Sequence, residues 1–300
     1  MNDTADDVLL PAFEGAMKRI TEESSMPEAL LHDGSTIEIV VHGTGPTLLL
    51  PVNPEPVVGP LAEQMRQYGT DPALGQSLIK GLSDAFRVVA FDYEGQCLRI
   101  PKPDTLTPAN VARDMLAIAD TVGAERFAYY GYSWLAVVGL QLAIRTERLW
   151  ALIMGGFPPL NGPYEEMLRV TTATYEMASG ARPLPSAEES EWGGGGLSSD
   201  QAQQFVTLYQ ALQGFDDRAA QTRITCPRLC FVGSKDEIQY DKNWDNVLVS
   251  LAGPMVHGQA QLAELGWDVR ILDDLDHIQA MQANHVLPML RSWLMAQLPS

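Results

Sequence analysis

The stretch RFAYYGYSWLAVVGLQLAIR, residues 126–145, decides how the rest of this chain is interpreted. Its aromatic run at 127–130 predicts a buried strand, and the apolar segment from Trp134 onward predicts a helix. Between them lies Ser133, in a Gly-Tyr-Ser-Trp-Leu sequence that fits four of the five positions of the pattern G-x-S-x-G. A serine on a sharp strand-to-helix turn holds its hydroxyl above the sheet edge, in front of the unpaired N–H groups of the helix. Ser133 is therefore a candidate nucleophile, and the alternative is an ordinary N-cap serine.

The composition indicates an acidic globular protein. Of the 300 residues 46% are apolar, which is ordinary for a packed core, and the formal net charge of -18 argues against binding to nucleic acid. The start, MNDTADDVLL, lacks the features of a signal peptide, and no apolar run is long enough to span a bilayer. Three cysteines cannot build a disulfide framework, and no His or Cys cluster has metal-ligand spacing. We expect a cytoplasmic protein without metal, cofactor, nucleic acid or membrane partner, and the sequence leaves a homodimer open.

Strand and helix patterns alternate along most of the chain. An Asp33-Gly34 turn between apolar runs predicts a first hairpin, and Thr107-Pro108 predicts the start of a helix. Further strands are predicted at 47–52, 86–91, 150–154, 228–233 and 269–272, and further helical patterns at 57–84, between 234 and 265, and at 278–297. This alternation is typical of an α/β protein whose mostly parallel sheet is covered by helices on both faces. In such a sheet the functional loops lie at the carboxyl ends of the strands.

The alternation stops between residues 157 and 221. This segment contains two helical patterns, at 164–177 and 201–212, separated by a Pro-, Ser- and Gly-rich stretch with four consecutive glycines at 193–196. Such a glycine run predicts a mobile loop. We therefore predict a core domain made of residues 1–156 and 222–300, with residues 157–221 inserted into it as a helical unit.

Three polar residues, Ser133, Asp236 and His277, each follow a predicted strand directly. The order Ser, Asp, His along the chain is one of the known orders for nucleophilic catalysis. A serine is a poor nucleophile until a base such as His277 removes its proton, and Asp236 would orient the imidazole. Taken singly, Asp236 is better explained as a turn-forming acid, and the alternative for His277 is a solvated loop histidine. Asp276 is a rival acid, but its position in the chain does not turn it toward the ring of its neighbour.

In these features the chain resembles the α/β-hydrolase fold proteins of the serine esterase type over nearly its whole length. The similar parts are the first hairpin with residues 43–46, the segment 91–95, the Ser133 turn, the insertion, and the loops that carry Asp236 and His277. The resemblance implies an eight-stranded, mostly parallel sheet whose first pairing is antiparallel, and a helical lid formed by residues 157–221. It also implies that Ser133 is the nucleophile, Asp236 the acid and His277 the base.

Two positions depart from the pattern of this family. Where the family usually has His-Gly after its third strand, this chain has Pro51-Val52-Asn53. The resemblance then places the oxyanion-binding N–H groups on Asn53 and Trp134. The second departure is Leu135, where the family has a small residue. A branched side chain there would push the helix outward or enter the floor of the pocket.

The expected lid is rich in aromatic and methionine side chains, which suits an uncharged or hydrophobic acyl substrate. Tyr132, Leu135, Tyr164 and Met167 are candidate pocket residues, although core packing is the simpler explanation for each one alone. The main hypothesis is hydrolysis of a carboxylic ester, lactone or thioester of a mostly uncharged small molecule through an acyl-enzyme at Ser133. One alternative uses the same three residues for carbon–carbon bond hydrolysis, or for a lyase or condensing step. Another is a weakly active, ligand-binding protein.

Overall fold

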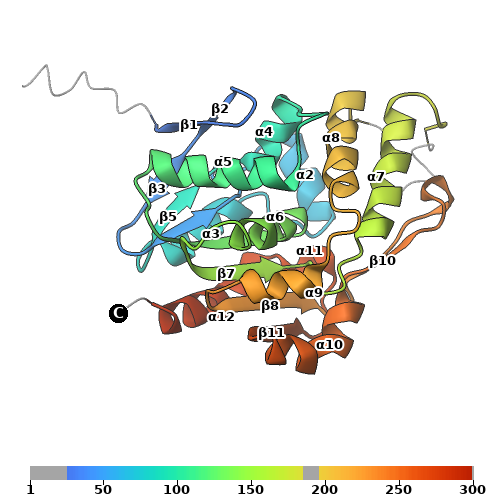
Figure 1. Cartoon of the computed structure of the whole chain (residues 1–300). Coiled ribbons are helices and arrows are strands. Elements are labelled where there is room, and N and C mark those ends of the chain that lie inside the picture. The colour runs from blue at the N-terminus through green and yellow to red at the C-terminus, as the bar shows by residue number, and fades with distance from the viewer. Residues whose placement is uncertain (1–25, 185–195, 299–300) are drawn as a thin grey trace, which may run out of the picture.

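The computed structural model describes residues 26–184 and 196–298, so most of the predicted glycine run lies outside the described residues. At its centre is a seven-stranded sheet in the order β11-β8-β7-β6-β4-β5-β3, in which β3 alone runs antiparallel (Figure 1). The predicted mostly parallel sheet is thereby confirmed. The strands are β3 (Val40–His42), β4 (Thr47–Leu50), β5 (Arg87–Ala90), β6 (Phe127–Tyr132), β7 (Leu149–Gly155), β8 (Arg228–Gly233) and β11 (Trp267–Leu272).

The predicted number of eight strands is wrong, because the first hairpin stays outside the main sheet. Its strands, β1 (Glu28–Leu30) and β2 (Thr36–Glu38), pair antiparallel with each other only. Ile39, between β2 and β3, is fully buried in the same core cluster as Ile37 and the helix residue Val111. The hairpin therefore packs its apolar side on α5 (Pro108–Thr121) and does not extend the sheet edge.

Helices cover both faces of the sheet, and the strands carry apolar residues on both sides. In β4, Leu49 belongs to one core cluster, whereas Leu48 and Leu50 belong to the other. Successive residues of a strand point to opposite faces, which explains why the segment is apolar throughout. One face is covered by α5, α6 (Trp134–Ala143) and α10 (Ala252–Glu264), and the other by α3 (Leu74–Leu82) and α12 (Ala283–Ala296).

Several connections bear on the candidate site. As predicted, the segment 57–84 is helical but interrupted, and forms α2 (Pro60–Gln67) and α3. After β5 the chain forms the helix α4 (Tyr93–Arg99), capped by Asp92, which accepts a hydrogen bond from Gly95 N at 2.9 Å. The region predicted to be helical after residue 233 begins with a hairpin of β9 (Glu237–Gln239) and β10 (Leu248–Ser250), joined through a 3-10 turn at Lys242–Trp244. The short helix α11 (His277–Ala280) follows β11.

The chain between β7 and β8 forms a helical insertion of α7 (Tyr164–Ala178), α8 (Ser199–Gln210) and the short α9 (Asp217–Ala220). The helices α7 and α8 pack side by side (Figure 1). Both are tied to the rest of the molecule by hydrogen bonds from their side chains or ends. Gln204 of α8 donates to the carbonyl of Cys97 at 3.1 Å, and Arg182, after α7, donates to the carbonyl of Asn243 at 2.7 Å. Within the described ranges, no helix is both long and apolar enough to cross a membrane.

Candidate active site

Ser133 lies on the sharp turn between β6 and α6. Its backbone has φ 57° and ψ -129°, a left-handed conformation that is costly for any residue with a side chain. The turn is held by a hydrogen bond from Ser133 N to the carbonyl of Gly155 at 2.8 Å. It also requires Gly131, because a Cβ atom there would lie 2.2 Å from the backbone oxygen of Leu135. The sequence around Ser133 therefore builds a strained turn that presents the serine hydroxyl.

Ser133, His277 and Asp236 form one continuous hydrogen-bonded row, called the Ser133 row below. Ser133 Oγ lies 3.1 Å from His277 Nε2, and His277 Nδ1 lies 2.8 Å and 3.0 Å from the two carboxylate oxygens of Asp236. The three residues follow β6, β8 and β11 at the carboxyl ends of these parallel strands. The structure thus brings together the three residues that their positions after predicted strands had singled out.

The Asp236 end of the row is buried and the His277 end is partly open. The Asp236 side chain is fully buried, whereas the His277 side chain is 18% exposed. Burial raises the pKa of Asp236, and the hydrogen bond and charge of His277 act against this rise. Asp276 points elsewhere, because its carboxylate caps α11 by accepting from Gln279 N at 2.8 Å. The carboxylate that faces the imidazole is therefore Asp236.

The two N–H groups predicted to bind an oxyanion differ in their surroundings. Trp134 is the first residue of α6, where a backbone N–H has no intrahelical acceptor. Asn53 N–H makes no hydrogen bond within residues 26–184 and 196–298, whereas the neighbouring Val52 N donates to the carbonyl of Leu50 at 2.9 Å. The Asn53 residue also lines a second hollow of about 450 Å³, next to Asp92 and away from Ser133. The role of Asn53 stays a prediction.

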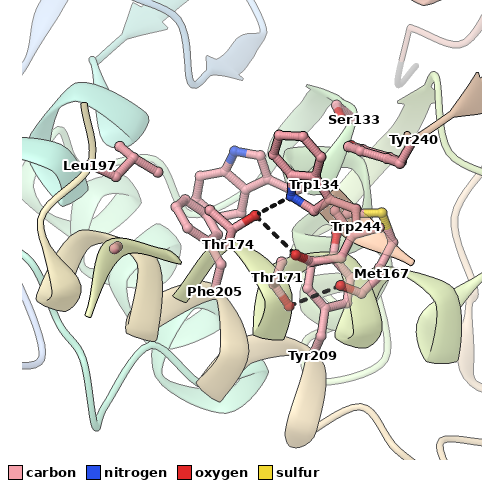
Figure 2. Close-up of a pocket in the computed structure, with 12 residues that line it drawn as sticks. Ser133, Trp134, Met167, Thr171, Thr174, Leu197, Phe205, Tyr209, Tyr240 and Trp244 are labelled. Atoms are coloured by element: carbon pink, nitrogen blue, oxygen red, sulfur yellow. Dashed lines mark hydrogen bonds between the residues drawn. The ribbon is translucent and has the colours of Figure 1, made fainter. Parts of the chain in front are cut away.

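A cavity of about 290 Å³ opens above Ser133 (Figure 2). Its walls come from the Ser133 turn, from α7, from α8 and Leu197 shortly before it, and from the β9–β10 hairpin. The hairpin wall is joined to α7, because the Trp244 indole N–H donates to Thr174 Oγ1 at 2.9 Å. The lining residues are Ser133, Trp134, Met167, Val170, Thr171, Thr174, Ala178, Leu197, Phe205, Tyr209, Tyr240 and Trp244.

Of the four predicted pocket residues, the structure places Met167 in the wall of this cavity and the other three behind it. Tyr132 lies against His277, and its hydroxyl donates to the His277 carbonyl at 2.7 Å. Leu135 is buried in the core, 6% exposed. Tyr164 packs against Phe157, with its ring centre 5.7 Å away, and its buried hydroxyl has no hydrogen-bond partner among the described residues.

Sequence reasoning missed most of the cavity wall, including Tyr240 and Trp244 from the unpredicted hairpin. The segment 57–84, which is long enough to border a pocket, contributes none of the lining residues. No group of three or more His, Cys, Asp or Glu side chains in the described part of the chain has an arrangement that could hold a metal ion.

Comparison with known proteins finds similar folds and one related sequence. No family model matches the chain. It is 30% identical over 130 residues to the strigolactone esterase D14 of Arabidopsis thaliana, a match that covers 36% of this chain and about half, 47%, of that protein. A thermophilic esterase from Thermogutta terrifontis has a similar structure, with a TM-score of 0.60, 17% identity, and coverage of 90% of this chain and 98% of that one. The enol-lactonase of Burkholderia xenovorans LB400 gives a TM-score of 0.57 and 19% identity, with 90% and 100% covered.

Proposed function

The chain has the α/β-hydrolase fold, and we propose that it is a serine hydrolase that works through an acyl-enzyme at Ser133. Its substrate would be a carboxylic ester, lactone or thioester of a mostly uncharged small molecule. In this proposal residues 157–221 form a lid on a core of residues 1–156 and 222–300. The esterase and lactonase with similar structures are consistent with hydrolysis, and the specific claim comes from the site itself.

One observation carries the proposal: a strained serine, hydrogen-bonded through an imidazole to a buried carboxylate, opens into a cavity. Holding Ser133 at φ 57° costs free energy that a purely structural serine would not require. The hydroxyl also lies 3.1 Å from His277 Nε2, and Ser133 is the N-cap residue of α6, an end of a helix where a negative charge is favoured.

The chemistry would proceed in two balanced halves. His277 Nε2 takes the proton of Ser133 as Oγ attacks the substrate carbonyl, and the developing oxyanion is bound by the N–H groups of Trp134 and Asn53. When the carbonyl re-forms, the alcohol or thiol leaves with the proton from His277 and the acyl group stays on Ser133. A water molecule then attacks the acyl carbon as His277 accepts its proton. The bond between the acyl carbon and Ser133 Oγ breaks, His277 returns the proton to Oγ, and the carboxylic acid leaves. Asp236 stabilises the imidazolium in both halves.

The cavity wall supports an uncharged acyl group. None of its twelve lining residues, all within the described ranges, carries a charged side chain. Trp134, Phe205 and Trp244 provide aromatic surface, and Met167 provides a flexible apolar contact. A charged acyl group would lose hydration here without gaining an ionic partner, so aromatic or branched apolar esters are expected to be the better substrates.

Labelling with a fluorophosphonate probe tests the proposal. The parent protein is expected to be labelled and Ser133→Ala is expected to remain unlabelled. A panel of aryl esters of graded acyl size, with Ser133→Ala as the control, then measures turnover. A parent protein that is neither labelled nor active on any ester would contradict the proposal and favour a ligand-binding role for the cavity.

A further inference from the structure

Tyr132, the residue immediately before the proposed nucleophile, contacts the proposed base in two ways. Its hydroxyl donates to the backbone carbonyl of His277 at 2.7 Å. Its ring lies against the imidazole, with ring centres 5.1 Å apart and an interplanar angle of 48°. The residue that precedes Ser133 in the chain thus holds both the main chain and the ring of a residue 145 positions away.

The surroundings leave the Tyr132 ring little freedom. Phe231 contacts one side, at 5.9 Å between ring centres. On another side the end of β7 carries Gly155 and Gly156, where an added Cβ atom would lie 2.6 Å from atoms of the Tyr132 ring in each case. Any larger residue at either glycine would displace the ring. The two glycines at the end of β7 therefore leave the space that the Tyr132 ring occupies.

Tyr132 faces away from the substrate cavity and keeps its proton. It is not among the cavity-lining residues. Burial, followed by the charge of the nearby Asp236 carboxylate, raises the pKa of Tyr132 far above its ordinary value. The hydroxyl is therefore a hydrogen-bond donor to the His277 carbonyl at every pH at which the protein is studied.

We infer that Tyr132 is a positioning residue that sets the base relative to the nucleophile. The strained turn that presents Ser133 also carries Tyr132, which contacts the carbonyl and the ring of His277. One short segment therefore positions both Ser133 Oγ and His277 Nε2. This inference rests on the proposed function, because it assigns Tyr132 a part in proton transfer between Ser133 and His277. It predicts that loss of the hydroxyl slows the chemical step and leaves substrate binding unchanged.

The test compares Tyr132→Phe with Tyr130→Phe. Tyr130 is a matched control, because it lies on the same strand and contacts the same Phe231 ring at 6.0 Å, and no contact between it and His277 is found in the described part of the chain. With an aryl ester that the parent hydrolyses, Tyr132→Phe is expected to lower kcat about tenfold, the change expected from one lost hydrogen bond of ordinary strength. KM should stay at the parent value, and the rate of fluorophosphonate labelling at Ser133 should fall in parallel with kcat. Tyr130→Phe should keep the parent kcat and labelling rate.

Titration of labelled sites corrects for any unfolded fraction, so a stability loss alone cannot imitate the expected result. Equal kcat values in the two phenylalanine variants would overturn the inference, as would a change in Tyr132→Phe confined to KM. Failure of the proposed function gives a different result, because the parent itself would then be neither labelled nor active. Tyr132→Leu, which also removes the ring contact, is expected to lower kcat further than Tyr132→Phe, and a smaller loss would count against the inference.

Discussion

The Ser133 row has a counterpart elsewhere in the molecule with nearly the same hydrogen-bond geometry. Thr105 Oγ1 lies 3.1 Å from His32 Nε2, and His32 Nδ1 lies 2.7 Å from Asp114 Oδ2. These three residues are called the Thr105 row. Both rows therefore join a hydroxyl, an imidazole and a buried carboxylate in the order that nucleophilic catalysis requires. Hydrogen-bond distances alone do not tell a catalytic row from a structural one.

The surroundings separate the two rows. In the Thr105 row, Asp114 accepts two further hydrogen bonds, from His32 N at 2.6 Å and from the Tyr93 hydroxyl at 2.7 Å. Its carboxylate is thereby used to tie the β1–β2 hairpin and α4 to α5. Thr105 is not on a strained turn, and it lines neither of the two hollows described above. What distinguishes Ser133 is the strain, the adjacent helix N-terminus and the cavity, so these features carry the functional argument.

The largest expected effect separates the rows by activity. His277→Ala is expected to lower ester turnover about 10⁴- to 10⁶-fold, because it removes the base that is hydrogen-bonded to Ser133 Oγ. His32→Ala removes the matching imidazole of the Thr105 row and should leave turnover per folded molecule at the parent level. Initial rates, corrected by circular dichroism for the folded fraction, measure both. A large activity loss in His32→Ala would show that the two rows are not functionally distinct.

A second difference between the rows is the pair of oxyanion donors proposed beside Ser133. Asn53→Pro removes one backbone N–H and is expected to lower kcat about 10²- to 10³-fold, with a smaller effect on KM. Asn53→Ala keeps the N–H and is the comparison variant, so its loss should be much smaller. Similar kcat values in both variants would place the second donor on another residue of this loop.

Removal of the carboxylate is expected to lower mainly the stability in the Thr105 row and mainly the ester turnover in the Ser133 row. Asp114→Ala leaves three donors around a fully buried position without an acceptor, and is expected to lower the free energy of unfolding by about 3 kcal/mol. Asp236→Ala should cost less stability, because burial already disfavours the charged form of that carboxylate, while it should abolish most turnover. Urea denaturation and ester turnover of both variants give the comparison. The reverse pattern would mean that the roles assigned to the two rows are exchanged.

The Ser133 row was predictable from sequence because the order of strands in a parallel sheet shows which residues lie at the same edge. Each of its residues follows a strand of the parallel sheet, and the carboxyl ends of such strands meet along one edge of a sheet. The same periodicity predicted both covered faces of the sheet. The number of strands was not predictable in this way, because burial of Ile39 against α5 decides that the first hairpin leaves the sheet.

The Thr105 row and the cavity wall left weaker signals in the sequence. Asp114 lies on the apolar face of α5 beside Val111 and Met115, and a carboxylate there indicates a buried partner but does not identify His32, 82 residues earlier. The hairpin that carries Trp244 has strands of only three residues, and its turn uses left-handed backbone at Asp245. Strands this short show no clear two-residue periodicity, so the wall they form was not predicted.

The smallest expected effect concerns an ion pair next to the Thr105 row and its contribution to the stability of the fold. Asp33, next to His32, is paired with the buried Lys102 ammonium. Burial by itself would raise the pKa of Asp33, but hydrogen bonds from Lys102 and Ser35 and the charge of Lys102 outweigh it and lower the pKa to about 2. Because this value lies below that of an unfolded chain, the ion pair stabilises the fold fully above about pH 4, and this contribution is lost progressively as the pH falls from about 4 through 2.

Asp33→Asn is therefore expected to be less stable than the parent by about 1 kcal/mol at pH 7, a value reduced for the solvent exposure of the carboxylate. The difference should shrink as the pH falls from about 4, because the parent Asp33 becomes half protonated near pH 2, and it should approach zero only below that pH. Urea denaturation across this range measures the difference. Asp120, which is 65% exposed beside Arg148, provides the control, and its Asn variant should match the parent stability at pH 7. A stability gap for Asp33→Asn that stays constant down to pH 2 would show that the pair with Lys102 is not what this region contributes, and would leave the hydrogen bonds of Asp114 as the main link between the hairpin and the core.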